Sequence, residues 1–151
     1  MAYSANKLQA AALRRLLDFD PDSGSEVIAT LDPANSVKCL PFSAGIAAVL
    51  VGLFRSVGAG TVSSFRIFVS DDAAGVTNAT NVVSHALGSA PDAVGDTIWL
   101  EATGEQLRAA SATALYWGVK VTLATSTDEC VLSISQYARH ASNGLTADYI
   151  S

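Results

Sequence analysis

The stretch that decides the fold is residues 114–137, which read ALYWGVKVTLAT, then STD, then ECVLSISQY. In its first part apolar residues occupy every second position, namely Leu115, Trp117, Val119, Val121 and Leu123. In its second part the alternation is repeated by Cys130, Leu132 and Ile134. A period of two is typical of a strand with one buried face. Because the connection at residues 126–128 is short and polar, we expect the two strands to fold into a β-hairpin.

Seven further apolar runs, each bounded by turn residues, indicate more strands. They span residues 26–31, 36–42, 46–57, 61–70, 77–87, 96–102 and 145–150. After the run at 96–102, Thr103 and Gln106 form a Thr-x-x-Gln capping box, which predicts a short helix through residues 107–110. Such a helix is too short to connect parallel strands. We therefore expect an all-β protein, an antiparallel jelly-roll-like β-sandwich.

An amphipathic helix is predicted before the strands, over residues 5–18, which read ANKLQAAALRRLLD. A period of 3.6 residues gathers the leucines on one face and most of the charged side chains on the other. Pro21 and the DPDSGS turn end this pattern, because proline removes a hydrogen-bond donor and the turn residues do not favour a helix. The chain therefore divides into an N-terminal helical arm and turn, residues 1–24, and a β-sandwich domain, residues 25–151.

The apolar face of this arm is the candidate partner-binding surface, formed by Leu8, Leu13, Leu16, Leu17 and Phe19. A leucine left in water forgoes about 1.5 to 3 kcal/mol of burial, so the face must pack on something. It can pack on the chain's own sandwich or on a neighbouring subunit, and we expect the neighbouring subunit. We also expect the β-domain to remain folded without residues 1–19.

The composition and net charge of the chain limit which kinds of partner it can bind. Charged residues make up 15% of the chain, against about a quarter in typical soluble domains, so its surface is either covered by other subunits or unusually rich in small residues. The net charge of −5 argues against nucleic acid, which requires clustered Lys and Arg. The longest apolar run, residues 44–54, is shorter than the ~20 residues of a membrane-spanning helix. We expect no membrane partner, synthesis in the cytoplasm, and two free thiols at Cys39 and Cys130.

Few residues suggest chemistry. Residues 18–24 place three aspartates at alternate positions, as a calcium loop does, but Ala29 stands where the bidentate glutamate belongs. His85 and His140 have no spacing that indicates a catalytic triad. We therefore expect no catalytic residue, no cofactor, no metal and no enzymatic activity.

The aromatic residues offer an alternative role in carbohydrate binding. Trp117 shares its phase with aliphatic residues and is expected in the core, whereas Trp99 lies out of phase with Ile98 and Leu100. We therefore expect Trp99 to be a contact residue. A carbohydrate-binding module would need Trp99 and a tyrosine exposed together.

The chain resembles the small decoration or cement proteins of tailed-phage capsids, many of which are jelly-roll-like sandwiches with an extended or helical terminal arm. The resemblance rests on the amphipathic stretch LQAAALRRLLDF and on strands rich in small residues, such as TVSSFRIFVS and ALYWGVKVTLAT. It implies a virion protein on the capsid surface that clamps neighbouring major capsid subunits by buried surface. The implied partners are the major capsid protein and other copies of this chain, with a homotrimer preferred. A carbohydrate- or receptor-binding module of a phage tail or fibre is the alternative.

Overall fold

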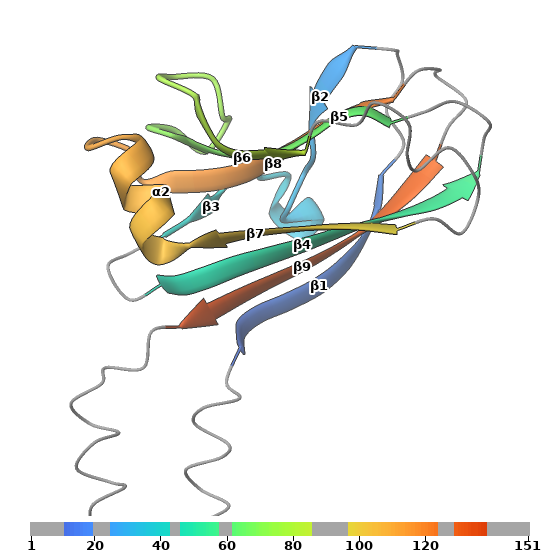
Figure 1. Cartoon of the computed structure of the whole chain (residues 1–151), viewed down its shortest axis with the longest axis horizontal. Helices are drawn as coiled ribbons and strands as arrows, with labels where there is room; N and C mark the ends of the chain where they lie inside the picture. The colour runs from blue at the N-terminus through green and yellow to red at the C-terminus, as the bar shows by residue number, and fades with distance from the viewer. Residues whose placement is uncertain are drawn as a thin grey trace, which may run out of the picture.

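The computed structural model describes residues 11–19, 25–42, 46–57, 62–85, 97–123 and 129–138. These residues form two antiparallel β-sheets, one on each side of a shared apolar core. Figure 1 shows the two sheets as a lower and an upper layer. The expected all-β sandwich is therefore confirmed.

The lower layer, sheet A, has the strand order β1-β9-β4-β7. Its strands are β1 (Ala11–Phe19), β9 (Glu129–Ala138), β4 (Ile46–Val57) and β7 (Thr97–Thr103). The upper layer, sheet B, has the order β2-β8-β5-β6, and β3 also pairs with β8. Its strands are β2 (Glu26–Ile28), β3 (Leu40–Pro41), β5 (Val62–Ser70), β6 (Thr80–His85) and β8 (Tyr116–Leu123). The chain passes from one sheet to the other several times.

The core is built from the residues that alternate inward along each strand. One row across sheet A shows the pattern, because its four members are paired side by side and all are buried: Leu17, Leu132, Leu53 and Ile98. From sheet B the fully buried residues facing them are Phe65, Ile67, Val69, Trp117, Val119 and Val121. The inward alternation predicted for the 114–137 stretch is thus confirmed at its centre. Leu115 is the exception, since it precedes β8 and is 60% exposed.

The predicted hairpin within residues 114–137 is wrong. β8 lies in sheet B, where β5 pairs along one edge and β2 and β3 pair along the other. β9 lies in sheet A between β1 and β4. The alternation indicates which face of a strand is buried, but it does not indicate the strand's pairing partner. Two strands that face each other across a core have the same pattern as a hairpin.

The predicted N-terminal helix is also wrong over its described residues. Ala11–Phe19 forms strand β1, which pairs with β9, while residues 5–10 lie outside the described part of the chain. Intrinsic helix propensities differ by less than about 1 kcal/mol per residue for ordinary residues, so sheet pairing and burial outweigh them. Residues 11–19 are therefore part of the sandwich and not of a separate N-terminal arm.

Most other expected elements are confirmed. β4 has the expected bounds, and β2, β5, β6, β7, β8 and β9 overlap their expected runs. The 36–42 run contains only the short β3, because Pro33–Asn35 (η1) and an isolated Asp32–Val37 bridge form a turn just before it. The expected strand at 145–150 lies outside the described residues.

The expected capping box is present and begins helix α2 (Gly104–Ala110). The Thr103 hydroxyl accepts a hydrogen bond from the Gln106 backbone N–H at 3.1 Å, and the Gln106 side-chain oxygen accepts one from the Thr103 N–H at 2.8 Å. These bonds satisfy donors that a helix start otherwise leaves unpaired. Leu107 is buried in the core, so this short helix closes one end of the sandwich (Figure 1).

A second apolar cluster lies on the outer side of sheet B. Phe68 on β5 points outward, yet it is fully buried, as is Cys39. A Cβ atom placed on Gly118 would lie 2.7 Å from the Cys39 sulfur and 2.7 Å from the Phe68 ring. Only glycine at this position lets the ring and the thiol pack on the strand without displacement.

The buried thiols lead to a first prediction. Burial raises the pKa of the Cys39 thiol to about 11, so this thiol stays protonated at neutral pH, and Cys130 is 1% exposed. Because the thiolate is the reactive form, we expect neither cysteine to react with iodoacetamide in the folded protein. In denaturant without reductant, intact mass should show two adducts. An adduct on the native protein, or failure to label both thiols after unfolding, would contradict this expectation.

Candidate functional site

The outer face of sheet A is the side turned away from the core, and its residues form rows across the four strands. The central row is Leu16, Ser133, Gly52 and Trp99. The row on one side is Asp18, Val131, Phe54 and Thr97. The row on the other side is Arg14, Ser135, Leu50 and Glu101. We call these twelve residues the sheet A face.

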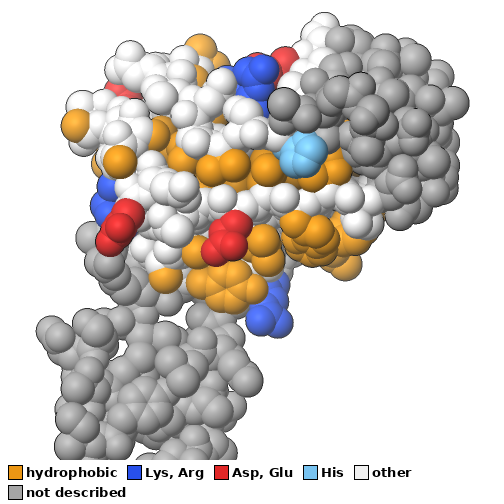
Figure 2. All heavy atoms as spheres, viewed as in Figure 1, with side chains coloured by type: hydrophobic (Ala, Val, Ile, Leu, Met, Phe, Trp, Pro, Cys, Tyr) orange, Lys and Arg blue, Asp and Glu red, His pale blue; other side chains and the backbone are white. Residues whose placement is uncertain are grey.

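Apolar side chains occupy both ends of the central row of the sheet A face and part of the rows on either side of it. Leu16 is 74% exposed and Trp99 is 49% exposed, while Leu50, Phe54 and Val131 are partly exposed. Figure 2 shows hydrophobic side chains gathered low in the view, where the strands of sheet A lie in Figure 1, with single charged side chains among them. Exposed apolar groups gathered in this way are typical of an interaction surface.

Trp99 is held in a defined position on this face. Its ring lies over Gly52, where an added Cβ atom would come within 2.6 Å of the indole, and it meets the Phe54 ring edge-on at a centroid distance of 5.5 Å. These contacts anchor one side of the indole and leave about half of the residue accessible. The expectation that Trp99 is available for contact is consistent with this exposure.

The outer side of sheet B carries more charged and hydroxyl side chains than the sheet A face. Glu26 lies 3.5 Å from Arg66 and 3.9 Å from Lys120, and the Ser64 hydroxyl donates to the Thr122 hydroxyl at 2.8 Å. Charged and hydroxyl side chains that pair with one another are suited to contact with water. The apolar sheet A face is therefore the stronger candidate for a protein contact.

The sequence analysis did not identify most of the sheet A face, although the apolar sequence of β4 indicated part of it. Residues 46–54 of β4 read IAAVLVGLF, with no polar residue on either face. An uninterrupted apolar run is typical of a strand covered on both faces, whereas on the outer side of β4 the described residues leave Leu50 and Phe54 partly exposed. The outward Leu50 and Phe54 could have been identified from this run.

Two more exposed apolar side chains lie on neighbouring segments near the α2 end of sheet B (Figure 1). They are Val76, which is 72% exposed, and Leu115, which is 60% exposed, and we call the pair the loop patch. The two segments that carry these residues are joined, because the Thr113 hydroxyl donates to the Asp71 carboxylate at 2.8 Å and the Leu115 N–H donates to the Ser70 carbonyl at 3.0 Å. The loop patch and the sheet A face belong to different layers of the sandwich.

Asp72 fixes the loop that carries Val76. Its carboxylate accepts hydrogen bonds from the backbone N–H groups of Val76 at 2.9 Å and Thr77 at 3.2 Å, and these bonds lower the pKa of Asp72. The acidic pair Asp71 and Asp72 therefore helps to hold the loop together. Asp72 positions Val76, and the Asp71 carboxylate accepts hydrogen bonds from the Asn78 and Thr113 side chains.

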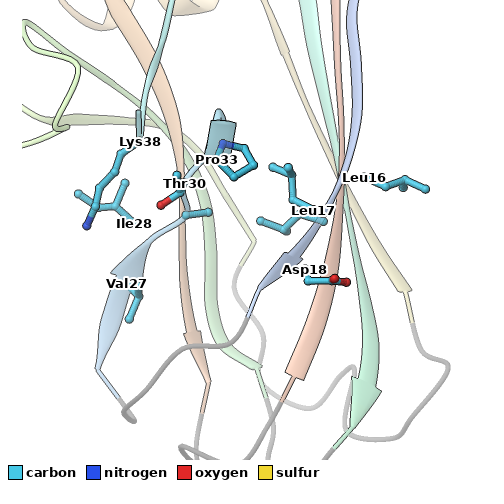
Figure 3. Close-up of a pocket in the computed structure, with 10 residues that line it drawn as sticks. Leu16, Leu17, Asp18, Val27, Ile28, Thr30, Pro33 and Lys38 are labelled. Atoms are coloured by element: carbon cyan, nitrogen blue, oxygen red, sulfur yellow. The ribbon is translucent and has the colours of Figure 1, made fainter. Parts of the chain in front are cut away.

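A cleft of about 510 Å³ opens between β1 and β2, the terminal strands of the two sheets (Figure 3). Its lining includes the apolar Leu17, Val27, Ile28 and Leu132 together with Asp18 and Lys38. Figure 3 shows Leu17 pointing into the cleft and the Leu16 side chain pointing to the other side of β1. The lining groups do not form a set that suggests acid, base or nucleophilic chemistry.

The structure separates the residues predicted to bind a partner. Leu17 lies in the core, Leu13 packs against the core, and only Leu16 points outward with a large exposed area. Phe19 ends β1 opposite Cys130, its side chain lies outside the description, and Leu8 lies outside the described residues. These residues do not form one face, because the strand period sends Leu16 and Leu17 to opposite sides.

Within the described residues, no group of three or more His, Cys, Asp or Glu side chains could hold a metal ion. His85 is exposed at the end of β6, while His140 and residues 20–24 of the calcium-like turn lie outside the description. No helix in the described ranges is long and apolar enough to cross a membrane. In comparisons with known proteins, the chain matches no family model and no curated protein.

Proposed function

We propose that this protein is a non-enzymatic structural protein of a phage virion, which decorates or cements the capsid by binding neighbouring major capsid subunits. The observation that carries the proposal is that exposed apolar groups lie in two separate places, the sheet A face and the loop patch. A protein that holds neighbours together needs at least two contact surfaces, whereas a module with one ligand needs only one.

The strand orders of the two sheets support the finer jelly-roll assignment. The chain places β1, β9, β4 and β7 in one layer and β2, β8, β5 and β6 in the other, as two interlocked antiparallel sheets. This arrangement is compatible with the jelly-roll form of many capsid decoration proteins. In the proposed role the partners are the major capsid protein and other copies of this chain, and the protein resides on the virion surface.

The test is binding to shells assembled from the major capsid protein of the same source. We expect the chain to sediment with the shells, and a Val76→Glu/Leu115→Glu variant to bind at least about tenfold more weakly, because each change puts a charge into a desolvated contact. Ser84→Glu, at an exposed position on β6, is the matched control and should bind as the unchanged chain does. Absence of sedimentation with shells would contradict the proposed function.

Carbohydrate binding is a second candidate, favoured by the half-exposed Trp99. Tyr137 shares the outer side of sheet A with Trp99, but it lies on β9, and register places it two rows farther along the strands. Two rows correspond to about 13 Å, too far for both rings to stack on one sugar. Glycan-array binding that is lost in Trp99→Ala would favour this alternative.

A further inference from the structure

We propose that the sheet A face pairs with the same face of a second copy of this chain, around a two-fold axis that runs along the strands. This pairing goes beyond the proposed function, because it requires no capsid shell and can be measured with the purified protein. The occupant of the face is a second copy because its charges and its large apolar groups are arranged in a self-complementary way.

The two oppositely charged residues of one row lie at opposite edges of the sheet. Arg14 on β1 and Glu101 on β7 both belong to the row that passes through Ser135 and Leu50. A two-fold axis that runs along the strands, between β9 and β4, places the β1 edge of one copy opposite the β7 edge of the other. Each row then lies opposite the same row of the second copy. Arg14 of each copy then faces Glu101 of the other, so the pairing contains two opposite-charge contacts.

The same operation brings together the two most exposed apolar residues of the face. Leu16 and Trp99 end the central row on β1 and β7, so each leucine meets the indole of the second copy. Between them lie Ser133, which is small, and Gly52, which is covered by the Trp99 ring of its own copy. The pairing also covers the outer side of β4, whose apolar residues are otherwise exposed in part.

A two-fold axis perpendicular to the strands accounts less well for the contacts between the large apolar side chains. It would place each residue of the central row against its own copy, so Trp99 would meet a second Trp99. It would also pair Arg14 with Asp18 and leave Glu101 opposite Thr97, whereas the axis along the strands pairs Arg14 with Glu101 and leaves Asp18 opposite Thr97. Each axis therefore gives two opposite-charge contacts, and the apolar residues distinguish the two. The axis along the strands instead sets the large indole of one copy against the smaller Leu16 of the other.

The area of the sheet A face determines how tightly we expect the two copies to bind. With ordinary strand spacings, the four strands and three rows of the face measure about 19 Å by about 20 Å, or about 400 Å² on each copy. The two copies together bury about 800 Å² of flat area, which is below the size of a standard interface and in the range of weak contacts. We therefore expect a dimer that dissociates at micromolar concentration.

The experiment is sedimentation velocity of the full chain from ~1 µM to ~500 µM, where a weak dimer changes from mostly dissociated to mostly associated. Leu16→Glu should weaken the dimer at least about tenfold, because the charge would be desolvated in the contact. Leu16 is largely exposed, so this variant should keep the melting temperature of the unchanged chain. Ser84→Glu adds the same charge on sheet B and should leave dimerisation unchanged.

Exchanging the charges of Arg14 and Glu101 tests the direction of the two-fold axis. Arg14→Glu and Glu101→Arg should each weaken the dimer, and the double variant should restore it. Restoration of Arg14→Glu by Asp18→Arg instead would overturn the axis along the strands. A chain that is monomeric throughout the concentration range, that forms only trimers, or that dimerises equally well with Leu16→Glu would overturn the pairing. None of these results depends on shell binding, so failure of the pairing and failure of the capsid role are distinguishable.

Discussion

A chain lacking residues 1–19 is expected to lose its cooperative unfolding transition. The deletion removes β1, which pairs with β9 from Ala11 to Phe19 and contributes the buried Leu17 to the core. It also removes Arg15, whose guanidinium donates to the Leu31 carbonyl at 2.7 Å and thereby links β1 to the turn before β3. Burial of Leu17 alone is worth about 1.5 to 3 kcal/mol, and a whole domain is stable by only about 5 to 15 kcal/mol.

Urea denaturation followed by circular dichroism measures this effect. A shorter deletion of residues 1–10 is the matched control, because it retains all of β1. The longer deletion should show a broad, non-cooperative loss of signal, and the control should keep a single transition. A cooperative transition in the longer deletion would restore the sequence-based expectation that the β-domain folds without the arm.

Replacement of Trp117 by alanine should lower the free energy of unfolding by about 3 to 5 kcal/mol, the usual cost of removing a large buried aromatic side chain. Trp117 is fully buried between the sheets, and its indole N–H donates to the Gln136 side-chain oxygen at 2.9 Å. The residue therefore fills the core and also joins β8 of sheet B to β9 of sheet A. Few single changes affect both layers in this way.

Two further variants separate the ring from the hydrogen bond. Trp117→Phe retains much of the apolar volume but leaves Gln136 without its donor, and Gln136→Leu leaves the indole N–H unpaired. Each should cost about 1 to 3 kcal/mol, less than the alanine variant, because one partner of a partly buried hydrogen bond is lost while most of the core volume remains. Thermal and urea unfolding of the three variants provide the measurement. An alanine variant as stable as the unchanged chain would show that Trp117 does not support the core.

Local sequence pattern determined most of the strands and their buried faces. Phe65, Ile67 and Val69 face inward as their alternation indicates, and the Thr103–Gln106 capping box starts a helix where it was expected. These features follow from side-chain period and from capping bonds three residues apart, so a short segment contains all the necessary information. Exposure of Trp99 followed from the same reasoning.

The partner of each strand and the conformation of residues 11–19 were decided only by the tertiary structure. Residues 11–19 are good helix formers, but β9 offers them a pairing edge and a place for Leu17, and these long-range interactions outweigh local propensity. The sheet A face also depends on such pairing, since Arg14 and Glu101 share a row only because β1, β9, β4 and β7 are adjacent. Sequence alone determined which residues turn inward, because that depends on neighbours along the chain. The three-dimensional fold determined which outward residues lie together, because that depends on strands far apart in the sequence.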